Sequence, residues 1–413
     1  MTVKKMSEWT TQRLEEIIQV NPTLKLTKGE VYPFIDIDKV SPTLRSVTNE
    51  EEKVYDGQSC SKFCNGDTVF SRITPCLENR KIAKVSIDGQ AAFGSTEFYI
   101  FRAKQGKSDE NFVYYLTSSD AVVLPAINSM TGASGRQRAD KRFIERTKLN
   151  VPDLPTQKRI AEILSVYDDL IENNNRRIAL LEKAAQELYK EWFVRFRFLG
   201  YENAKLENGL PDGWDYIRFG NAIEIIDGDR GVNYPKQEEF YEEGECLFLN
   251  AGNVTKNGFD FSSCAYITKE KDRLLRKGKL QTGDVVLTTR GTVGNVAFLN
   301  ETITFSPMRI NSGMVILRNL GVVSPEYIYT ALRHESLQKA MMMYASGSAQ
   351  PQLPIKDMRR IKIIKADAKT MDKFTKYVAD IYKQVSLMIM KNQAISKQRD
   401  LLLPRLMSGK LEV

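Results

Sequence analysis

The stretch that decides the fold opens with Leu154-Pro155-Thr156-Gln157-Lys158-Arg159-Ile160-Ala161-Glu162-Ile163-Leu164. Thr156 is a suitable N-cap for a long helix, because the prolines just before it exclude a helix interior. Residues at a spacing of seven, which is the heptad spacing of coiled coils, follow as Ile160, Tyr167, Asn174, Leu181 and Leu188. The apolar stripe is widened by Ile163, Leu164, Leu170, Ile171, Ile178 and Trp192.

The end of the chain repeats this helix at an offset of 214 residues, which aligns Thr156 with Thr370 and Leu188 with Leu402. The same heptad spacing recurs at Phe374, Ile381, Met388, Ile395 and Leu402. One interpretation is that each apolar stripe packs on its own globular domain. Because two matched helices recur in one chain and neither has enough core to be stable alone, we expect them to pair with each other. Asn174 is a polar exception of the kind that fixes helix register.

The rest of the chain is also present in two copies. Two Gly-Asp turns each lead into an apolar, β-rich run, and a second strand-like run and a small-residue loop follow in both halves. The aligned pairs are Trp9–Leu14 with Trp214–Phe219, Asn65–Ser71 with Thr282–Thr288, Phe98–Arg102 with Met314–Arg318, and Thr131–Arg138 with Ala345–Gln352.

The predicted fold class is α+β, with two similar globular α/β domains, each followed by a long helix. We expect the two helices to pair as an antiparallel coiled coil with a pseudo-twofold axis. The predicted segments are a first globular domain at 1–150, a first helix at 151–197, a linker at 198–213, a second globular domain at 214–366 and a second helix at 367–413.

The composition is that of a globular protein. Of 413 residues, 42% are hydrophobic and 27% are charged, which excludes a disordered chain. No apolar run is long enough to span a bilayer, and no apolar segment follows the N-terminal lysines, so we expect a cytoplasmic protein without a membrane partner. The net charge of +8 moderately favours a phosphate-bearing partner.

Few residues are suited to catalysis or to metal binding. Cys60, Cys64 and Cys76 lie close together, but no fourth cysteine or histidine is near them to complete a zinc site. The single histidine, His334, has charged neighbours typical of a helix surface. Phosphate-loop, dinucleotide-binding, methyltransferase and nuclease motifs are all missing. The sequence therefore predicts no catalytic residues and no metal site.

In combination, the two halves resemble the specificity subunit of a type I restriction-modification system. The segments that carry this resemblance are Leu154–Leu164, Leu188–Phe193, Leu210–Trp214 and Leu402–Leu411. The resemblance covers essentially the whole chain in order.

The resemblance implies a non-catalytic subunit in which each globular domain is a target-recognition domain for one half of a split double-stranded DNA sequence. It implies that the paired helices set the unread spacer. Two methyltransferase subunits would bring S-adenosylmethionine and restriction subunits would bring ATP, whereas this chain binds no cofactor. The alternative is a protein-interaction scaffold that does not read DNA, and salt-dependent, sequence-selective DNA binding would distinguish the two.

Candidate DNA-contacting residues are basic and amide side chains on predicted loops, because arginine pairs with guanine and glutamine with adenine. A solvated loop or a structural salt bridge remains the alternative at each position. The candidates are Arg72, Arg136, Gln137, Arg138, Arg230, Thr289, Arg290, Gln350 and Gln352.

Overall fold

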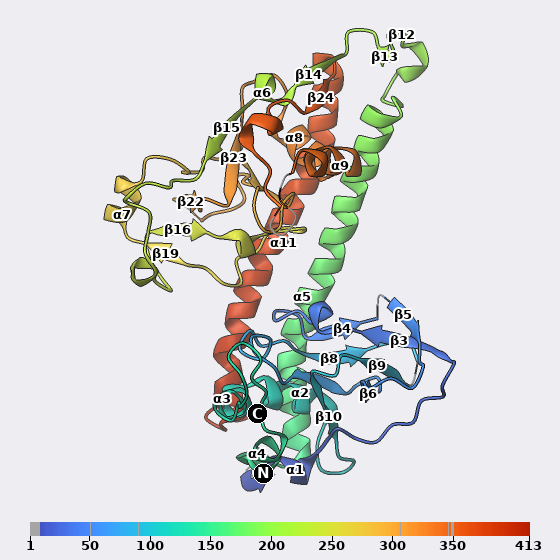
Figure 1. Ribbon diagram of the computed structural model, residues 1–413, viewed down its shortest axis with the longest axis vertical. Coiled ribbons are helices and arrows are strands. Elements are labelled where there is room, and N and C mark those ends of the chain that lie inside the picture. The colour runs from blue at the N-terminus through green and yellow to red at the C-terminus, as the bar shows by residue number, and fades with distance from the viewer. Residues whose placement is uncertain (1–8, 50, 90, 306, 346, 348–350) are drawn as a thin grey trace, which may run out of the picture. The chain divides into compact units, whose positions relative to one another are not determined.

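The computed structural model describes residues 9–49, 51–89, 91–305, 307–345, 347 and 351–413. The chain forms two compact units (Figure 1). The first unit is Met1–Glu172 together with Ile395–Val413, and the second unit is Asn173–Ala394. The two long helices, α5 (Leu154–Tyr189) and α11 (Ala368–Met407), each contribute residues to both units. The α+β class is confirmed.

Among its described residues, the first unit contains two main sheets and four short α-helices beside its share of the long helices. Its elements are β1 (Trp9–Arg13), α1 (Leu14–Ile17), β2 (Ile18–Val20), β3 (Val31–Ile35), β4 (Ser46–Thr48), β5 (Glu51–Val54), β6 (Ser61–Phe63), β7 (Thr68–Ser71), β8 (Ile82–Ser86), β9 (Ala92–Gly94), β10 (Phe98–Ala103), α2 (Glu110–Ser118), α3 (Asp120–Asn128), α4 (Lys141–Arg146) and β11 (Lys148–Pro152). One sheet has the order β2-β10-β7-β8-β4 and the other β5-β3-β9-β6. Successive side chains of a strand point to opposite faces, so Val69 packs with Phe63 towards the second sheet while Phe70 packs with Phe112 of α2.

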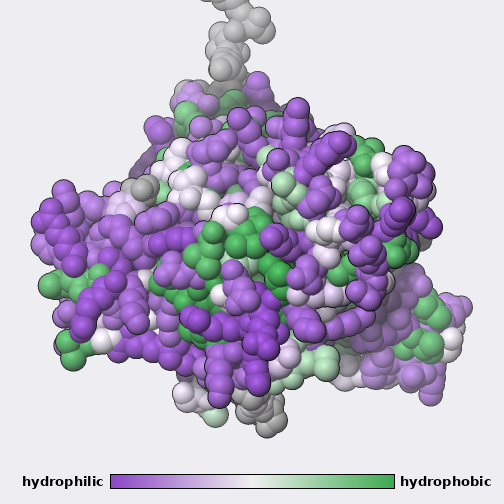
Figure 2. Space-filling view, turned by 90° about the horizontal axis from the view of Figure 1, so that it is seen from above, coloured by the Kyte–Doolittle hydropathy of each residue, from purple (hydrophilic) through white to green (hydrophobic). Residues whose placement is uncertain are grey.

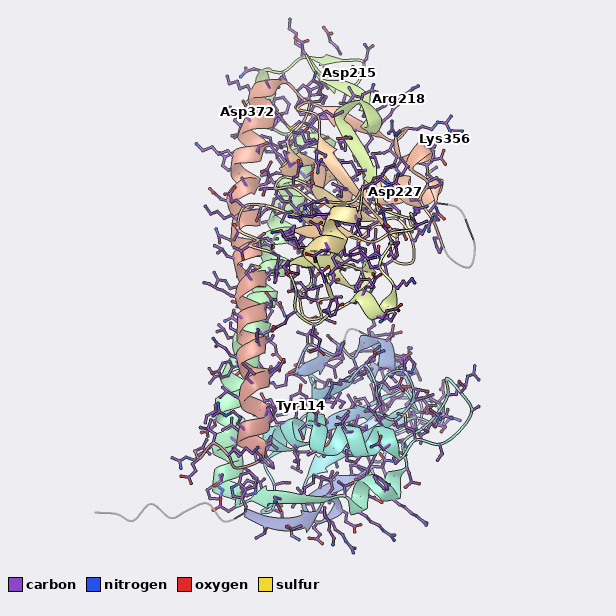
Figure 3. All side chains as sticks on the ribbon, turned by 90° about the vertical axis from the view of Figure 1, so that its left-hand side faces the viewer. Tyr114, Asp215, Arg218, Asp227, Lys356 and Asp372 are labelled. Atoms are coloured by element: carbon purple, nitrogen blue, oxygen red, sulfur yellow. The ribbon has the colours of Figure 1, made fainter. Side chains whose placement is uncertain are left out.

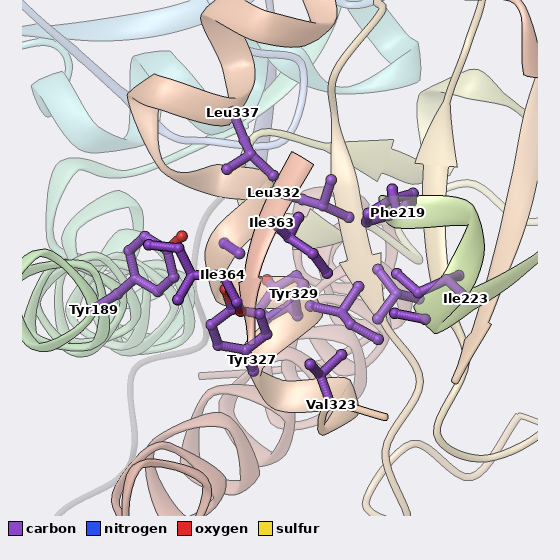
Figure 4. Packing of buried hydrophobic residues seen from close by; sticks show 14 of the residues in the cluster. Tyr189, Phe219, Ile223, Val323, Tyr327, Tyr329, Leu332, Leu337, Ile363 and Ile364 are labelled. Carbon is purple, nitrogen blue, oxygen red and sulfur yellow. The ribbon is translucent and has the colours of Figure 1, made fainter. Parts of the chain in front are cut away.

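The second unit follows the same plan. Its elements are β12 (Leu206–Glu207), β13 (Leu210–Pro211), β14 (Asp215–Arg218), α6 (Phe219–Ala222), β15 (Ile223–Asp227), β16 (Cys246–Leu249), β17 (Val254–Thr255), β18 (Gly258–Phe259), β19 (Tyr266–Ile267), α7 (Lys269–Leu274), β20 (Val285–Thr288), β21 (Val296–Phe298), β22 (Met308–Ile310), β23 (Met314–Asn319), α8 (Pro325–Arg333), α9 (Glu335–Tyr344), α10 (Ile355–Met358) and β24 (Lys362–Lys365). Its largest sheet, β15-β23-β20-β21, repeats the order β2-β10-β7-β8 of the first unit. Figure 4 shows Tyr327 and Leu332 of α8 packed beside Phe219 and Ile363 in the main core of this unit.

In each unit, the strand that opens the repeated part of the sequence pairs with the last strand. Strand β1 pairs antiparallel with β11, and β14, whose ends Asp215 and Arg218 are labelled in Figure 3, pairs antiparallel with β24. A one-turn helix follows β1 and β14 in both cases. The predicted match of Trp9–Leu14 with Trp214–Phe219 is therefore confirmed as a repeated strand and helix.

Each Gly-Asp turn has the same structural role. Asp67 accepts two hydrogen bonds from Arg102, at 2.7 and 2.6 Å, and Asp284 accepts two from Arg318, at 2.9 and 2.7 Å. Both aspartates are almost fully buried. A buried carboxylate is costly unless it is paired, so each aspartate depends on its arginine. Each bidentate pair also joins the start of one central strand to the end of its neighbour.

The first long helix begins earlier than the sequence suggested. The prediction that Thr156 is the N-cap is wrong, because the carboxylate of Asp153 accepts a hydrogen bond from the backbone N–H of Thr156 at 3.2 Å. In the second helix, Asp367 accepts from the N–H of Thr370 at 3.0 Å. An aspartate has the short acceptor that an N-cap needs, and Leu154 and Pro155 fit in the first turn, where a free N–H is not required.

The long helices pair antiparallel within each unit. In the first unit, Asp168 of α5 forms an ion pair with Arg399 of α11, and Ile160 and Leu164 share a core with Leu406. In the second unit, Ile178 packs with Val385 and Met388, and Trp192 lies beside Phe374 with 5.9 Å between ring centroids. The partner's residue number falls as that of α5 rises. The predicted antiparallel pairing is therefore confirmed.

The buried face of each long helix is centred on residues next to the predicted heptad positions. The most continuous series at seven-residue spacing is Gln157, Leu164, Ile171, Ile178 and Ala185 in α5, continued by Trp192 in the π-helical turn (Lys190–Val194) that follows it, and all six residues are buried. Of the predicted positions, Ile160, Asn174, Phe374 and Met388 are buried, whereas Tyr167, Leu181, Leu188, Ile381, Ile395 and Leu402 are half-buried. Ile163 and Leu170, expected to widen the stripe, are exposed instead. A helix that also packs on a globular domain buries a broader and shifted face.

Polar side chains pair with each other inside the helix interface. The amide of Asn174 donates to the side-chain oxygen of Asn392 at 2.7 Å, and Asn392 donates to Asn175 at 2.9 Å. A further buried pair connects Glu182 of α5 to Arg333 of α8 at 2.5 Å. Because a shifted register would leave these buried groups without partners, they favour one alignment of the helices.

Two smaller features are the environment of the single histidine and a turn in the predicted linker. His334 was expected on a helix surface, but it is buried between α8 and α9, where its Nδ1 lies 2.8 Å from the hydroxyl of Ser336. Burial lowers its pKa, because it disfavours the charged imidazolium. In the predicted linker, Asn208 and Gly209 both have positive φ and form the two-residue turn between β12 and β13.

Candidate nucleic-acid interface

In the first unit, the small-residue loop is held against the end of strand β7. Backbone hydrogen bonds of 3.0 and 2.9 Å between Thr131 and Arg138 close this loop. Arg72 is the residue directly after β7, and its carbonyl accepts a hydrogen bond from the N–H of Ala139 at 2.8 Å. These bonds bring together the four candidates of this unit, which we call the first loop cluster: Arg72, Arg136, Gln137 and Arg138.

A carboxylate lies between two of these arginines. Glu97 accepts hydrogen bonds from Arg138 at 2.9 and 2.5 Å and from Nε of Arg72 at 3.2 Å. The guanidinium of Arg72 also lies 5.5 Å from the centre of the Tyr99 ring. The hydrogen bond from Arg138, with the charges of both arginines, holds the pKa of Glu97 below its usual value against the effect of burial.

The other two candidates of this cluster have fewer contacts. Arg136 is exposed, and within the described part of the chain its side chain forms no hydrogen bond or ion pair. Gln137 is half-buried, and its backbone exchanges two hydrogen bonds of 3.0 Å with Thr74. The guanidinium of Arg136 is therefore free to meet a ligand from solvent.

In the second unit, the candidates gather around the segment Asn311–Gly313. The carbonyl of Gly313 accepts from the N–H of Thr289 at 2.8 Å and from that of Arg290 at 3.2 Å. Arg290 is also bridged to Gln352 through the backbone, and Leu353 donates to Thr289 at 3.0 Å. We call Arg230, Thr289, Arg290 and Gln352 the second loop cluster.

Arg230 joins this cluster from the loop after β15. Its Nη2 donates to the carbonyl of Ser312 at 3.2 Å and forms an ion pair with Asp227, the last residue of β15, at 3.1 Å. Figure 3 labels Asp227 in the second unit. About half of the Arg230 side chain remains exposed. Arg230 is thus held by one acidic partner while the rest of its guanidinium faces solvent.

The members of the second loop cluster differ in what they present. Thr289 is buried and its hydroxyl donates to the carbonyl of Gly313 at 3.1 Å, so it supports the loop rather than facing a ligand. Gln352 is exposed, whereas Arg290 is half-buried and its Nε has no hydrogen-bond acceptor among the described residues. Gln350 lies outside the described residues.

The two clusters occupy equivalent places in the repeat. In each, the backbone carbonyl of the residue just after a central strand, β7 or β20, accepts a hydrogen bond from the residue that follows the small-residue loop. Arg72 accepts from Ala139 in the first unit, and Thr289 accepts from Leu353 in the second. The sequence aligned both segments between the two halves, but it did not predict that the strand end and the loop meet within each half. Glu97, Asp227 and the Asn311–Gly313 segment were missed, because no motif distinguishes them until the loops have folded together.

Arginine and glutamine side chains on exposed loops have the donors and acceptors that contact phosphates and base edges. Figure 2 shows one face of the molecule, which is mostly hydrophilic around an apolar patch near its centre. Among the described residues, no group of His, Cys, Asp and Glu is arranged to hold a metal ion. No helix in this part of the chain is long and apolar enough to cross a membrane. The geometry is that of a polar binding surface.

Comparisons with known proteins agree with this organisation. The family described as type I restriction modification DNA specificity domain matches the chain twice, over residues 6–183 and 211–395. The type I restriction enzyme MjaIX specificity subunit of Methanocaldococcus jannaschii is 26% identical, covering 98% of this chain and 94% of the relative. The type I restriction enzyme HindI specificity subunit of Haemophilus influenzae is 23% identical, covering 86% of this chain and 88% of the relative.

The fold has also been seen in a solved structure. The S subunit of a type I restriction-modification system from M. genitalium superposes with a TM-score of 0.51 at 15% identity, over 98% of each chain. At this identity the likeness concerns the fold alone. The two family matches together cover most of the sequence, one in each half. The chain therefore belongs to the family of type I restriction-modification DNA specificity subunits.

Proposed function

We propose that this chain is the DNA-reading subunit of a type I restriction-modification complex, with each unit contacting one half of a split target through its loop cluster. The observation that carries the proposal is the repetition itself. Two clusters with the same backbone pairing stand in two copies of one fold, and each copy has its own match to the DNA specificity family. Two related modules in one chain suit a target with two half-sites.

The remaining parts of the proposal concern partners. The chain recruits two methyltransferase subunits, which bind S-adenosylmethionine, and restriction subunits, which bind ATP. It performs no catalysis and binds no cofactor itself. Membership of a family of specificity subunits supports this division of roles. The same membership supports a location in the cytoplasm, where the DNA is.

Methylation mapping tests the proposal directly. The full chain is co-expressed with the methyltransferase subunit of its own system, and the purified complex is incubated with DNA of known sequence and S-adenosylmethionine. We expect methylation at one bipartite sequence with a fixed spacer. Affinity for this sequence should fall as salt rises, because phosphate contacts release counterions.

A scaffold that does not read DNA is the second candidate, favoured by the two long paired helices. Under that reading the complex would assemble, yet all DNA sequences would bind equally and methylation would show no shared pattern. That outcome would contradict the proposed function.

A further inference from the structure

The two loop clusters differ at one equivalent position. Glu97 and Gly313 each stand directly before a central strand, β10 or β23. The carbonyl of Glu97 accepts from the N–H of Arg72 at 2.9 Å, and the carbonyl of Gly313 accepts from the N–H of Thr289 at 2.8 Å. The backbone roles are the same, but only the first unit has a side chain there, and that side chain is a carboxylate.

This carboxylate changes what the neighbouring arginines can do. Arg138 uses Nε and one Nη2 hydrogen on Glu97, which leaves three of its five N–H donors, and Arg72 uses only Nε. The side chain of Glu97 is one-fifth exposed, whereas those of Arg72 and Arg138 are 30% and 46% exposed. The free donors of both arginines therefore reach solvent from a fixed position, and one of the two positive charges is balanced.

Among its described residues, the second unit has no carboxylate at the position equivalent to Glu97. Gly313 contributes only its backbone, and Nε of Arg290 is buried without an acceptor in the described part of the chain. Asp227 balances Arg230, but the side chain of Arg290 has no carboxylate partner among the described residues. A carboxylate partner holds a guanidinium in one geometry, which suits contacts to base edges, and lowers its attraction to the phosphates of unrelated DNA; a guanidinium without that partner can still read a base but keeps its full attraction to phosphates.

We propose that Glu97 is a specificity-determining residue of the first unit, which positions Arg72 and Arg138 for base contacts and suppresses their attraction to DNA of any sequence. The second unit reads its half-site with Arg290, which lacks this restraint. The inference rests on the proposed function, since it concerns how the same surface distinguishes sequences.

The equivalence of the two positions provides a reciprocal test. Glu97→Gln removes the negative charge with little change in size. Gly313→Glu introduces a carboxylate beside Arg290, because a Cβ at Gly313 would lie 4.0 Å from the Cβ of Arg290. Its closest neighbour would be the side-chain oxygen of Asn311 at 3.3 Å, and the backbone φ of Gly313 is not in the left-handed region, so a side chain requires only a small shift. Glu51→Gln is the matched control, because Glu51 is exposed and pairs with Lys53 outside the cluster.

The experiment measures binding of the full chain with its methyltransferase subunits to libraries in which either half-site is randomised, at several salt concentrations. Glu97→Gln should bind unrelated DNA more tightly, with a salt slope steeper by about one. Selectivity at one or more positions of a single half-site should fall about ten-fold, which is within the range of one lost base contact. Gly313→Glu should weaken binding to unrelated DNA and change selectivity only in the other half-site, and Glu51→Gln should resemble the parent chain.

Glu97→Asp keeps the charge and should keep the low affinity for unrelated DNA, which a purely structural role would not explain. The inference is overturned if Glu97→Gln folds normally and leaves selectivity in both half-sites unchanged. It is also overturned if both half-sites lose selectivity equally, or if Gly313→Glu affects the half-site that Glu97 affects. Failure of the parent chain to select any split sequence would instead reject the proposed function.

Discussion

At the scale of single residues, Arg136 and Arg290 should contribute to DNA binding in different ways. Arg136 is exposed and its side chain has no partner in the described chain, whereas Arg290 is half-buried and bridged to Gln352. We expect Arg136→Ala to weaken binding to all sequences alike and to reduce the salt slope by about one, as for a phosphate contact. We expect Arg290→Ala to cost ~1–3 kcal/mol on the preferred sequence and to relax preference at one base position.

Equilibrium binding against salt, with preferred and unrelated DNA, checks both expectations. Arg13→Ala is a suitable control, because Arg13 is an exposed arginine in β1, outside both loop clusters. Parent-like affinity of Arg290→Ala at low salt, with folding intact, would remove Arg290 from the interface.

Residue types at the candidate interface were easier to predict than their surroundings. The aligned segments located Arg72 and Arg138 in the sequence. Folding brings the two arginines together through the backbone hydrogen bond between Arg72 and Ala139 and through Glu97, which accepts from both side chains. Burial of Thr289 was not predictable, because it depends on the segment Asn311–Gly313, which comes from elsewhere in the sheet. Glu97 gave no signal, since its partners lie 25 and 41 positions away along the chain.

At the scale of elements, the helix caps provide a test of local stability. Asp153 and Asp367 occupy the same place at the start of α5 and α11, but Asp367 also accepts a hydrogen bond from Nε1 of Trp214 at 3.1 Å. We expect Asp153→Ala to lower the free energy of unfolding by about 0.5–2 kcal/mol, as for other lost caps. Asp367→Ala should lower it further, because the partly buried indole N–H also loses its acceptor.

Denaturant titration followed by circular dichroism measures both changes. Asp367→Asn separates the two contributions, since its single oxygen can still cap the helix at Thr370 but its NH2 group cannot accept from Trp214, so its stability should lie between those of the parent and Asp367→Ala. Equal stability of Asp367→Ala and the parent would show that neither hydrogen bond contributes.

The seven-residue spacing of the long helices was predicted correctly, but the positions at the centre of their interface were not. Heptad spacing identified both long helices, because hydrophobic residues recur along them at seven-residue intervals. The centre of the interface lies instead on the series through Leu164 and Ile178, and at the matching offset in α11 it includes Asn392 and Arg399. Counting apolar residues cannot find positions where polar groups are paired with each other inside an interface.

At the scale of the whole molecule, the paired helices are the part of the chain that both units share. Helices α5 and α11 pair antiparallel in each unit, and each helix is continuous at the residues where one unit ends and the other begins. If each loop cluster keeps its place on its own section of these helices, the length of the pair sets the unread spacer of the DNA target. The spacer should then change with helix length while the half-sites stay the same.

A paired insertion tests this dependence. Asn174 faces Asn392, so one heptad is added beside each of them, which keeps the buried series in register on both helices. Seven residues add ~10 Å at 1.5 Å per residue, which corresponds to about three base pairs at ~3.4 Å each. Methylation mapping of the variant with its methyltransferase partner should therefore show the same two half-sites with about three more base pairs between them.

An insertion of three or four residues in α5 alone should rotate its apolar face and lower stability, since half the interface would lose its partners. Targets with the original spacer would show that the helices do not set it, and altered half-sites would show that reading and spacing are not separate.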